Sequence, residues 1–151
     1  MIKQIISDQY RFKINQLLEL NKINRPKEGW IRTLRKALGM SSPQLAVRLG
    51  IGKSQASQME RMEGENRITL RQLRRVANTL DCDLVYALVP RLPVETMIRE
   101  RAKLKAQRLV SKTDVQMKLE AQQLSREALH ERVDAEVDRL LREMPRDLWE
   151  D

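Results

Sequence analysis

The sequence predicts a mainly α-helical protein with one short strand and a helical C-terminal extension. Its 151 residues include only five Gly and five Pro, the residues that most often interrupt helices. Apolar residues recur at helical spacing along most of the chain. At three places a Ser or Thr is followed three residues later by Gln, ahead of an apolar stretch. This is the spacing of a helix-capping box.

Two helices are predicted before residue 40. Residues 8–23 place apolar side chains along one helical stripe, and Pro26 ends this helix because it disfavours helical backbone at the preceding residue. Residues 28–38 are predicted as the second helix, with Gly39 as its C-cap.

Three further helices follow in close succession. Ser41 and Gln44 have capping-box spacing and predict a short third helix that ends at Gly50. A fourth helix is predicted over residues 53–62. Thr69, with a Gln three residues later, caps the fifth.

A continuous apolar run at residues 84–89 lies between Asp83 and Pro90. Its six residues are rich in Val and include a Tyr, a composition that favours a short buried strand over a helix. The sequence therefore predicts one strand, directly after the fifth helix.

The C-terminal extension is predicted to be helical. One helix is expected over residues 94–110, the spacing at Thr113 predicts a new helix start, and Ser125 caps the last helix. The apolar stripe at residues 129–144 must be buried somewhere. It can fold back on its own domain, form a dimer interface, or belong to a tail that masks a toxin. Of these we expect a homodimer.

Positive charge is concentrated in the first three quarters of the chain. Lys and Arg number 29 against 21 Asp and Glu, which gives a net charge of +8. Residues 1–26, 27–92 and 93–112 carry +3, +6 and +4, whereas residues 113–151 carry −5. A basic chain of this kind most often binds a polyanion, with nucleic acid as the first candidate. The acidic end is expected to contact protein.

The composition excludes several other classes of protein. The single Cys and single His leave no disulfide and no zinc site of the usual kind. The chain offers no catalytic set of His, carboxylate and nucleophile and no Gly-rich phosphate loop, so we expect neither an enzyme nor a cofactor. No apolar run is long enough for a membrane span. A cytoplasmic, nucleoid-associated protein is predicted.

The third and fourth predicted helices have the arrangement of a helix-turn-helix. Their connection, residues 49–52, is very short. Ala46 is small enough for the helices to cross closely, Gly50 suits the positive φ of the turn, and Ala56 faces the core. We therefore divide the chain into an N-terminal helix (1–26), a helix-turn-helix domain (27–92) and the extension (93–151).

The fourth helix has an outward face suited to duplex DNA. Ile51 and Met59 face the core, which leaves a polar row outside without a carboxylate before Glu60. Gln pairs with adenine and Lys with guanine in the major groove, while Ser and Arg hold phosphates. The predicted base-reading residues are Lys53, Ser54, Gln55 and Gln58. The predicted phosphate-contacting residues are Ser42, Gln44, Ser57, Arg61 and Arg67.

Residues 29–84 resemble the helix-turn-helix domain of the lambda-repressor, or XRE-like, class. The resemblance implies a five-helix domain and a buried salt bridge between Arg35 and Glu60, which removes Glu60 from base recognition. The class usually has Gln as the first residue of the second helix of its domain, where this chain has Ser42. Gln44 is predicted to substitute for that Gln in contacting the DNA backbone.

A closer resemblance, to the mobile mystery protein A family, extends over most of the chain. It is carried by RPKEGWIRTLRKALGMSSPQLAVRLGI (25–51), ITLRQLRRVANTLDCDLVYALVP (68–90) and MKLEAQ (117–122). Members are small bacterial proteins of mobile elements, typically encoded beside a Fic-domain protein, mobile mystery protein B. The resemblance implies an antitoxin-type autorepressor of its own operon. The alternative is a protein-binding antitoxin that sequesters the Fic-type toxin, with DNA binding secondary.

Overall fold

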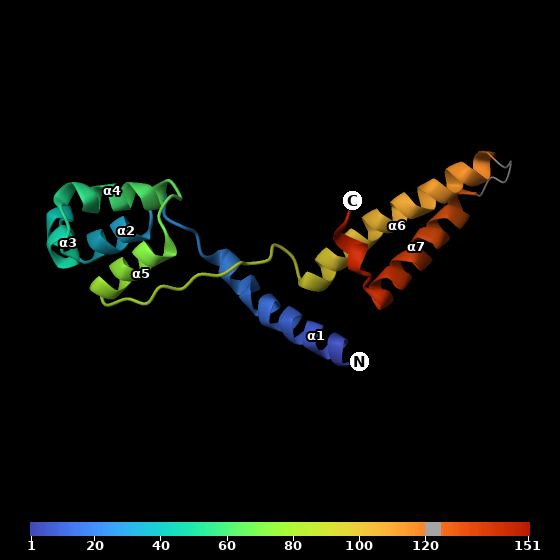
Figure 1. Cartoon of the computed structure of the whole chain (residues 1–151), viewed down its shortest axis with the longest axis horizontal. Coiled ribbons are helices and arrows are strands. Elements are labelled where there is room, and N and C mark those ends of the chain that lie inside the picture. Colours follow the sequence, from blue (N-terminus) through green and yellow to red (C-terminus); the bar gives the residue numbers. More distant parts are fainter. Residues whose placement is uncertain (120–124) are drawn as a thin grey trace. The chain divides into compact units, whose positions relative to one another are not determined.

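The computed structural model describes residues 1–119 and 125–151, which form seven α-helices and two short 3₁₀-helices (Figure 1). These elements belong to two compact units. The central unit comprises residues 20–88, and the terminal unit combines residues 1–19 with residues 89–151. Both ends of the chain therefore belong to the same unit.

The central unit consists of four helices. They are α2 (Trp30–Ala37), α3 (Ser42–Leu49), α4 (Lys53–Gly64) and α5 (Leu70–Thr79). Each contributes apolar side chains to one core, because the apolar residues of each helix recur on one side. The buried members of this core are Ile31, Leu45, Leu49, Val76 and Leu80. The helices of the unit thus surround a core of aliphatic side chains.

Local signals mark the starts of α3 and α5 and the end of α3. Two of the three predicted capping boxes are confirmed: Ser41 and Thr69 each accept a hydrogen bond from the backbone N–H three residues later, and the side chains of Gln44 and Gln72 accept one from the Ser41 and Thr69 backbone N–H groups. Gly50, at the C-cap of α3, has a φ of +66°, which glycine adopts at little cost.

The terminal unit joins the N-terminal helix to the C-terminal helices. Helix α1 (Ile2–Asn15) continues into the 3₁₀-helix η1 (Gln16–Lys22), and α6 (Val94–Leu119) and α7 (Arg126–Glu143) are followed by the 3₁₀-helix η2 (Arg146–Trp149). The Asn15 side chain accepts a hydrogen bond from the Val94 backbone N–H at 2.9 Å and donates one to Glu95 at 2.9 Å. The end of α1 thereby caps the start of α6.

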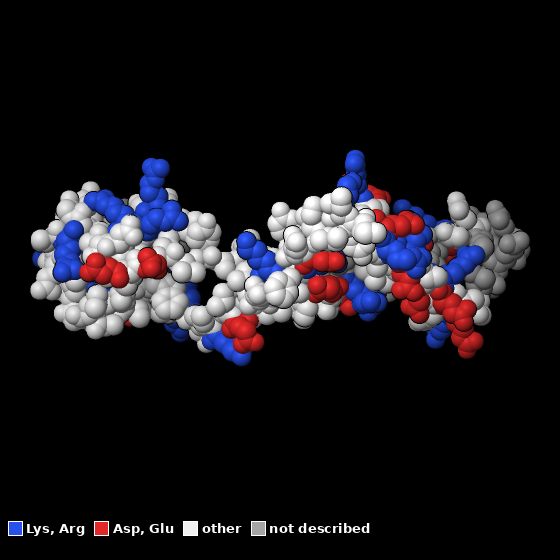
Figure 2. Space-filling model, turned by 90° about the horizontal axis from the view of Figure 1, so that it is seen from below, with Lys and Arg blue, Asp and Glu red and all other residues white. Residues whose placement is uncertain are grey.

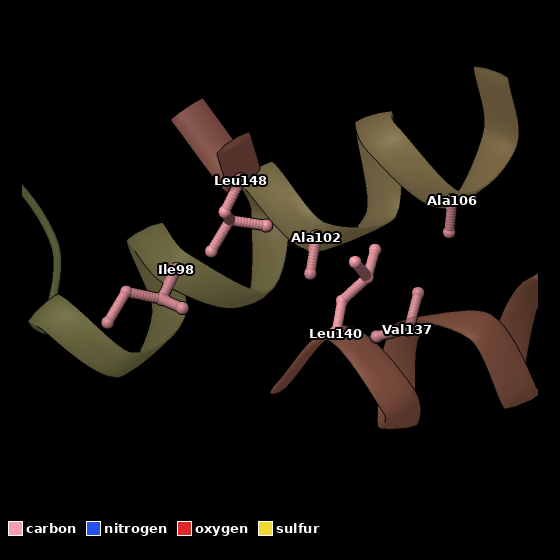
Figure 3. Packing of buried hydrophobic residues seen from close by; sticks show 6 residues of the cluster. All are labelled: Ile98, Ala102, Ala106, Val137, Leu140 and Leu148. Carbon is pink, nitrogen blue, oxygen red and sulfur yellow. The ribbon is translucent and has the colours of Figure 1, made fainter. Parts of the chain in front are cut away.

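The core of the terminal unit lies between α6, α7 and η2. Figure 3 shows Ala102 of α6 beside Leu140 of α7 and Leu148 of η2. Alanine on α6 allows α7 to approach closely. Leu140 is only 1% exposed, and Val137 of the same stripe is also buried. Of the alternatives for the stripe at residues 129–144, the structure shows the first, in which it folds back on its own chain.

The acidic C-terminus is held by basic residues of α6. Arg101 donates hydrogen bonds to the backbone carbonyls of Leu148 and Glu150, and its guanidinium lies 3.1 Å from Asp151. Lys105 lies 2.8 Å from the Asp147 carboxylate. Basic and acidic side chains nearly balance in the terminal unit, which has a net charge of +1, while the central unit carries +7.

Three sequence-based expectations need correction. Within the described residues no strand is present, and residues 84–89 carry no regular secondary structure, because a strand needs a neighbour for its backbone hydrogen bonds. The five-helix domain is also wrong: the central unit has four helices, and α1 belongs to the terminal unit. No helix starts at Thr113, because α6 runs through it without interruption.

The extent of the remaining elements also differs from the prediction. The N-terminal helix begins at Ile2, and its predicted second half is the 3₁₀-helix η1. Ser125 does cap α7, since its hydroxyl accepts a hydrogen bond from the Ala128 N–H at 3.2 Å. The motif MKLEAQ (117–122) lies partly outside the described residues, from residue 120 onward.

Candidate nucleic-acid interface

The turn between α3 and α4 fixes the position of the candidate interface. The Ile51 backbone N–H donates to the Ala46 carbonyl at 3.0 Å, directly after Gly50 in its left-handed conformation. Ala46 and Ala56 are 3% and 0% exposed, and Ile51 packs against the core of the central unit. Small residues at the crossing of the two helices thus hold α4 in a single orientation against α3.

The outer face of α4 presents polar side chains that are free to bind a ligand. Lys53, Ser54, Gln58 and Arg61 are exposed. Within the described part of the chain, none of these side chains makes a hydrogen bond or an ion pair. Their donors and acceptors therefore face solvent without a protein partner to displace.

Gln55 and Gln44 have structural roles in addition to their predicted contacts. The Gln55 side-chain oxygen accepts a hydrogen bond from the Gly52 N–H at 3.0 Å, and that of Gln44 accepts one from the Ser41 N–H at 2.8 Å. Each oxygen caps the start of its helix. The amide NH₂ groups are thus the parts of these side chains left for DNA.

The predicted phosphate-contacting residues fall into two environments. Ser42 of α3 and Ser57 of α4 are half-buried, and their hydroxyl oxygens lie 3.3 Å apart. Arg67 is exposed in the loop after α4 and lies 2.6 Å from the Glu65 carboxylate. An exposed ion pair of this kind contributes at most about 1 kcal/mol, so a phosphate can replace Glu65 as the partner of Arg67.

Glu60 points into the protein and away from the outer face of α4. Its side chain is 2% exposed, and its carboxylate lies 2.5 Å from Arg35 Nε and 3.0 Å from Arg32 Nε. Burial alone would raise the pKa of Glu60, but hydrogen bonds from Arg35 and Arg32 hold the pKa below its ordinary value. The salt bridge implied by the resemblance is present, with Arg32 as an additional partner.

Sequence reasoning missed Glu63 of α4, which caps the start of α2. Its carboxylate accepts hydrogen bonds from the backbone N–H groups of Trp30 and Ile31, at 2.7 and 2.8 Å. The Glu63 backbone carbonyl in turn accepts a hydrogen bond from Arg25. Because Glu63 lies 33 positions along the chain from Trp30, no local sequence pattern indicates this cap. The available signal was Gly29, which stands at the N-cap of α2 and has no side chain to cap the helix, so that another residue had to supply the cap.

The charge of the central unit favours an anionic ligand. The first turn of α4 contains no acidic residue, and its free backbone N–H groups and helix dipole favour negative charge at this end. In Figure 2, Lys and Arg side chains are prominent on the visible face of the central unit, and most of the visible acidic groups lie on the terminal unit. An anion approaching the molecule therefore meets its strongest attraction at the central unit.

No other kind of site is evident in the part of the chain that the structure describes. There, His, Cys, Asp and Glu do not gather into a group able to hold a metal ion. Among the same residues, no helix has the length and apolar character to cross a membrane.

The comparisons with known proteins agree with this geometry. Residues 31–86 match a family model described as helix-turn-helix, which spans α2 to α5 and part of the segment that follows. No curated protein and no solved structure matches the chain. Residues 31–86 therefore form a helix-turn-helix domain of the DNA-binding, lambda-repressor-like (XRE) class.

Proposed function

We propose that the protein is a sequence-specific DNA-binding transcriptional regulator that places α4 in the major groove. The observation that carries this proposal is the outer face of α4, where Lys53, Ser54 and Gln58 are exposed and have no partner among the described residues. Unpartnered donors and acceptors on a rigidly held helix are what recognition of base edges requires.

The residues of the interface divide by role. Lys53, Ser54 and Gln58 contact bases directly, and Gln55 contributes through its amide NH₂ while its oxygen stays on the Gly52 N–H. Phosphate contacts flank this row and fix the register of the helix in the groove. They come from Ser42, Gln44, Ser57, Arg61 and Arg67.

We further propose that the regulated operon is the protein's own. The resemblance to the mobile mystery protein A family supports an antitoxin-type autorepressor, encoded beside a Fic-domain partner. An autorepressor binds the DNA upstream of its own gene, and this property distinguishes it from a regulator that controls only other genes.

Footprinting on the DNA upstream of the gene tests the proposal. We expect a protected region that persists in excess random competitor DNA, because base contacts add to the nonspecific phosphate attraction. The same titration at two salt concentrations separates the contribution of base contacts from that of phosphate contacts, since phosphate contacts weaken as the salt concentration rises. Loss of all protection in competitor DNA would refute sequence-specific regulation.

A further inference from the structure

The segment after α5 exposes an apolar run that has no partner in the described structure. Val85, Tyr86 and Leu88 are 82%, 65% and 89% exposed. The backbone groups of residues 84–89 make no hydrogen bond within the described residues. Exposed aliphatic side chains and an unpaired backbone with strand-type composition together form a template for pairing with another strand.

We propose that this segment pairs with the same segment of a second copy of the chain, as an antiparallel two-stranded ribbon about a twofold axis at Ala87. The symmetry requires the two residues of each opposed pair to lie equally far from the axis. The ribbon is thus an interface between two copies, and it requires no DNA.

The pairs that this register creates are complementary. Asp83 of one copy lies opposite Arg91 of the other at both ends of the ribbon, while Val85 lies opposite Val89. Both charged side chains are exposed and make no ion pair within the described residues. Opposed charges and opposed β-branched side chains are favourable cross-strand pairs. Shifting the axis to residue 86 or 88 would place Asp83 opposite Val89 or Pro93, neither of which is charged.

The central unit supplies an apolar surface that a ribbon can cover. A pocket of about 300 Å³ is lined by side chains of α2 and α5 and by the first residues of the segment, including Trp30, Leu73 and Leu84. Trp30 is 49% exposed there. Because alternate residues of a strand share a face, Tyr86 and Leu88 follow Leu84 on the same side. A two-stranded ribbon needs packing of this kind, since an isolated one is marginally stable.

Cysteine crosslinking tests the register directly. In a Cys82→Ser background, Ala87→Cys should form an intermolecular disulfide, because the two residues 87 are directly opposed at about 5 Å between Cα atoms. Val85→Cys alone should not crosslink, since its two copies lie about 13 Å apart along the ribbon. A mixture of the Val85→Cys and Val89→Cys proteins should crosslink. Equal crosslinking of Ala87→Cys and Val85→Cys would overturn the proposal.

A charge swap tests the same interface without cysteine, by analytical ultracentrifugation in the absence of DNA. We expect a dimer whose Kd rises about tenfold in Asp83→Arg and in Arg91→Asp. The double variant Asp83→Arg/Arg91→Asp should recover the original Kd, because the opposed charges are restored. A monomeric wild-type protein at tens of micromolar, or single variants with unchanged Kd, would refute the pairing. Neither result bears on DNA binding, which is measured separately by footprinting.

Discussion

The Glu63 carboxylate occupies the space that a side chain at Gly29 would need. A Cβ atom on Gly29 would lie 2.8 Å from Glu63 Oε2, and Gly29 has a φ of +86°. That carboxylate caps α2 through the backbone of Trp30 and Ile31. Glycine is therefore required at position 29 for two reasons. Its backbone has a positive φ that glycine adopts readily, and a side chain there would block the approach of Glu63 to the start of α2.

Replacing Gly29 should therefore destabilise the central unit. We expect Gly29→Ala to lower the free energy of unfolding by about 2–4 kcal/mol, because it combines backbone strain with displacement of the cap. Gly64→Ala is the matched control. Gly64 ends α4 with open space around its Cα and without a positive φ, so its replacement should be neutral or slightly stabilising. Chemical denaturation of both variants makes the comparison, and equal losses of stability would contradict the role of Glu63.

The buried carboxylate of Glu60 should make stability depend on pH. Its pKa in the folded protein lies below the ordinary value, so the unfolded chain takes up the proton first on acidification. The stabilisation is complete above about pH 5 and disappears as the pH falls through the folded pKa. Urea denaturation between about pH 3 and 7 should show this decline.

The variant Glu60→Gln isolates that contribution. It should be about 3 kcal/mol less stable than the wild type at pH 7, because Arg35 loses its buried partner. Its stability should then fall less steeply toward acid pH. Glu65→Gln, which removes an exposed partner of Arg67, should change stability by less than about 1 kcal/mol and keep the wild-type pH profile. A Glu60→Gln profile parallel to the wild type would disprove the assignment.

Local and long-range interactions differ in what the sequence could reveal. The boxes at Ser41 and Thr69 were predictable because each is complete within four residues. The contact of Asn15 with Val94 and the cap from Glu63 join distant positions, and no local pattern encodes them. The apolar run at residues 84–89 has strand composition, but a strand also requires a partner, which composition cannot supply.

The candidate site shows the same division. The outward positions of Lys53 and Gln58 follow from helical periodicity once Ala56 faces the core. The capping role of Gln55 was missed, although Gly52 stands three residues before it, because Gly lacks the capping side chain that usually marks this pattern. The sequence therefore predicted which face of α4 is turned outward, but it did not predict the structural role of each side chain on that face.

The terminal unit should depend on the packing of α7 against α6. Leu140 is 1% exposed, so Leu140→Ala should destabilise this unit by about 2–5 kcal/mol through reduced burial and a residual cavity. Leu104→Ala, on a side chain that is 51% exposed, should cost less than about 1 kcal/mol. Hydrogen exchange of the α6 and α7 amides measures the effect. Unchanged protection in Leu140→Ala would show that this core does not hold the two helices together.

The phosphate-binding and base-reading side chains should respond differently to salt. Arg61→Ala should weaken binding to all DNA sequences and lower the slope of log K against log salt by about 0.9, the value for one phosphate that is no longer neutralised. Gln58→Ala should keep the slope, cost about 1–3 kcal/mol on the operator and relax the base preference. Fluorescence anisotropy at several salt concentrations distinguishes the two. A changed slope in Gln58→Ala would place that side chain on the phosphate backbone.

One measurement tests most directly whether α4 reads DNA. It is the ratio of operator affinity to random-DNA affinity, measured for the double variant Lys53→Ala/Gln58→Ala. The matched control is Lys103→Ala/Gln107→Ala, which removes the same exposed residue types from α6 of the terminal unit. We expect the ratio to fall about thirtyfold or more in the α4 variant, because each of its two substitutions removes about 1–3 kcal/mol of base discrimination. The α6 variant should keep the wild-type ratio. An unchanged ratio in a folded α4 variant would contradict the assignment of α4 as the recognition helix.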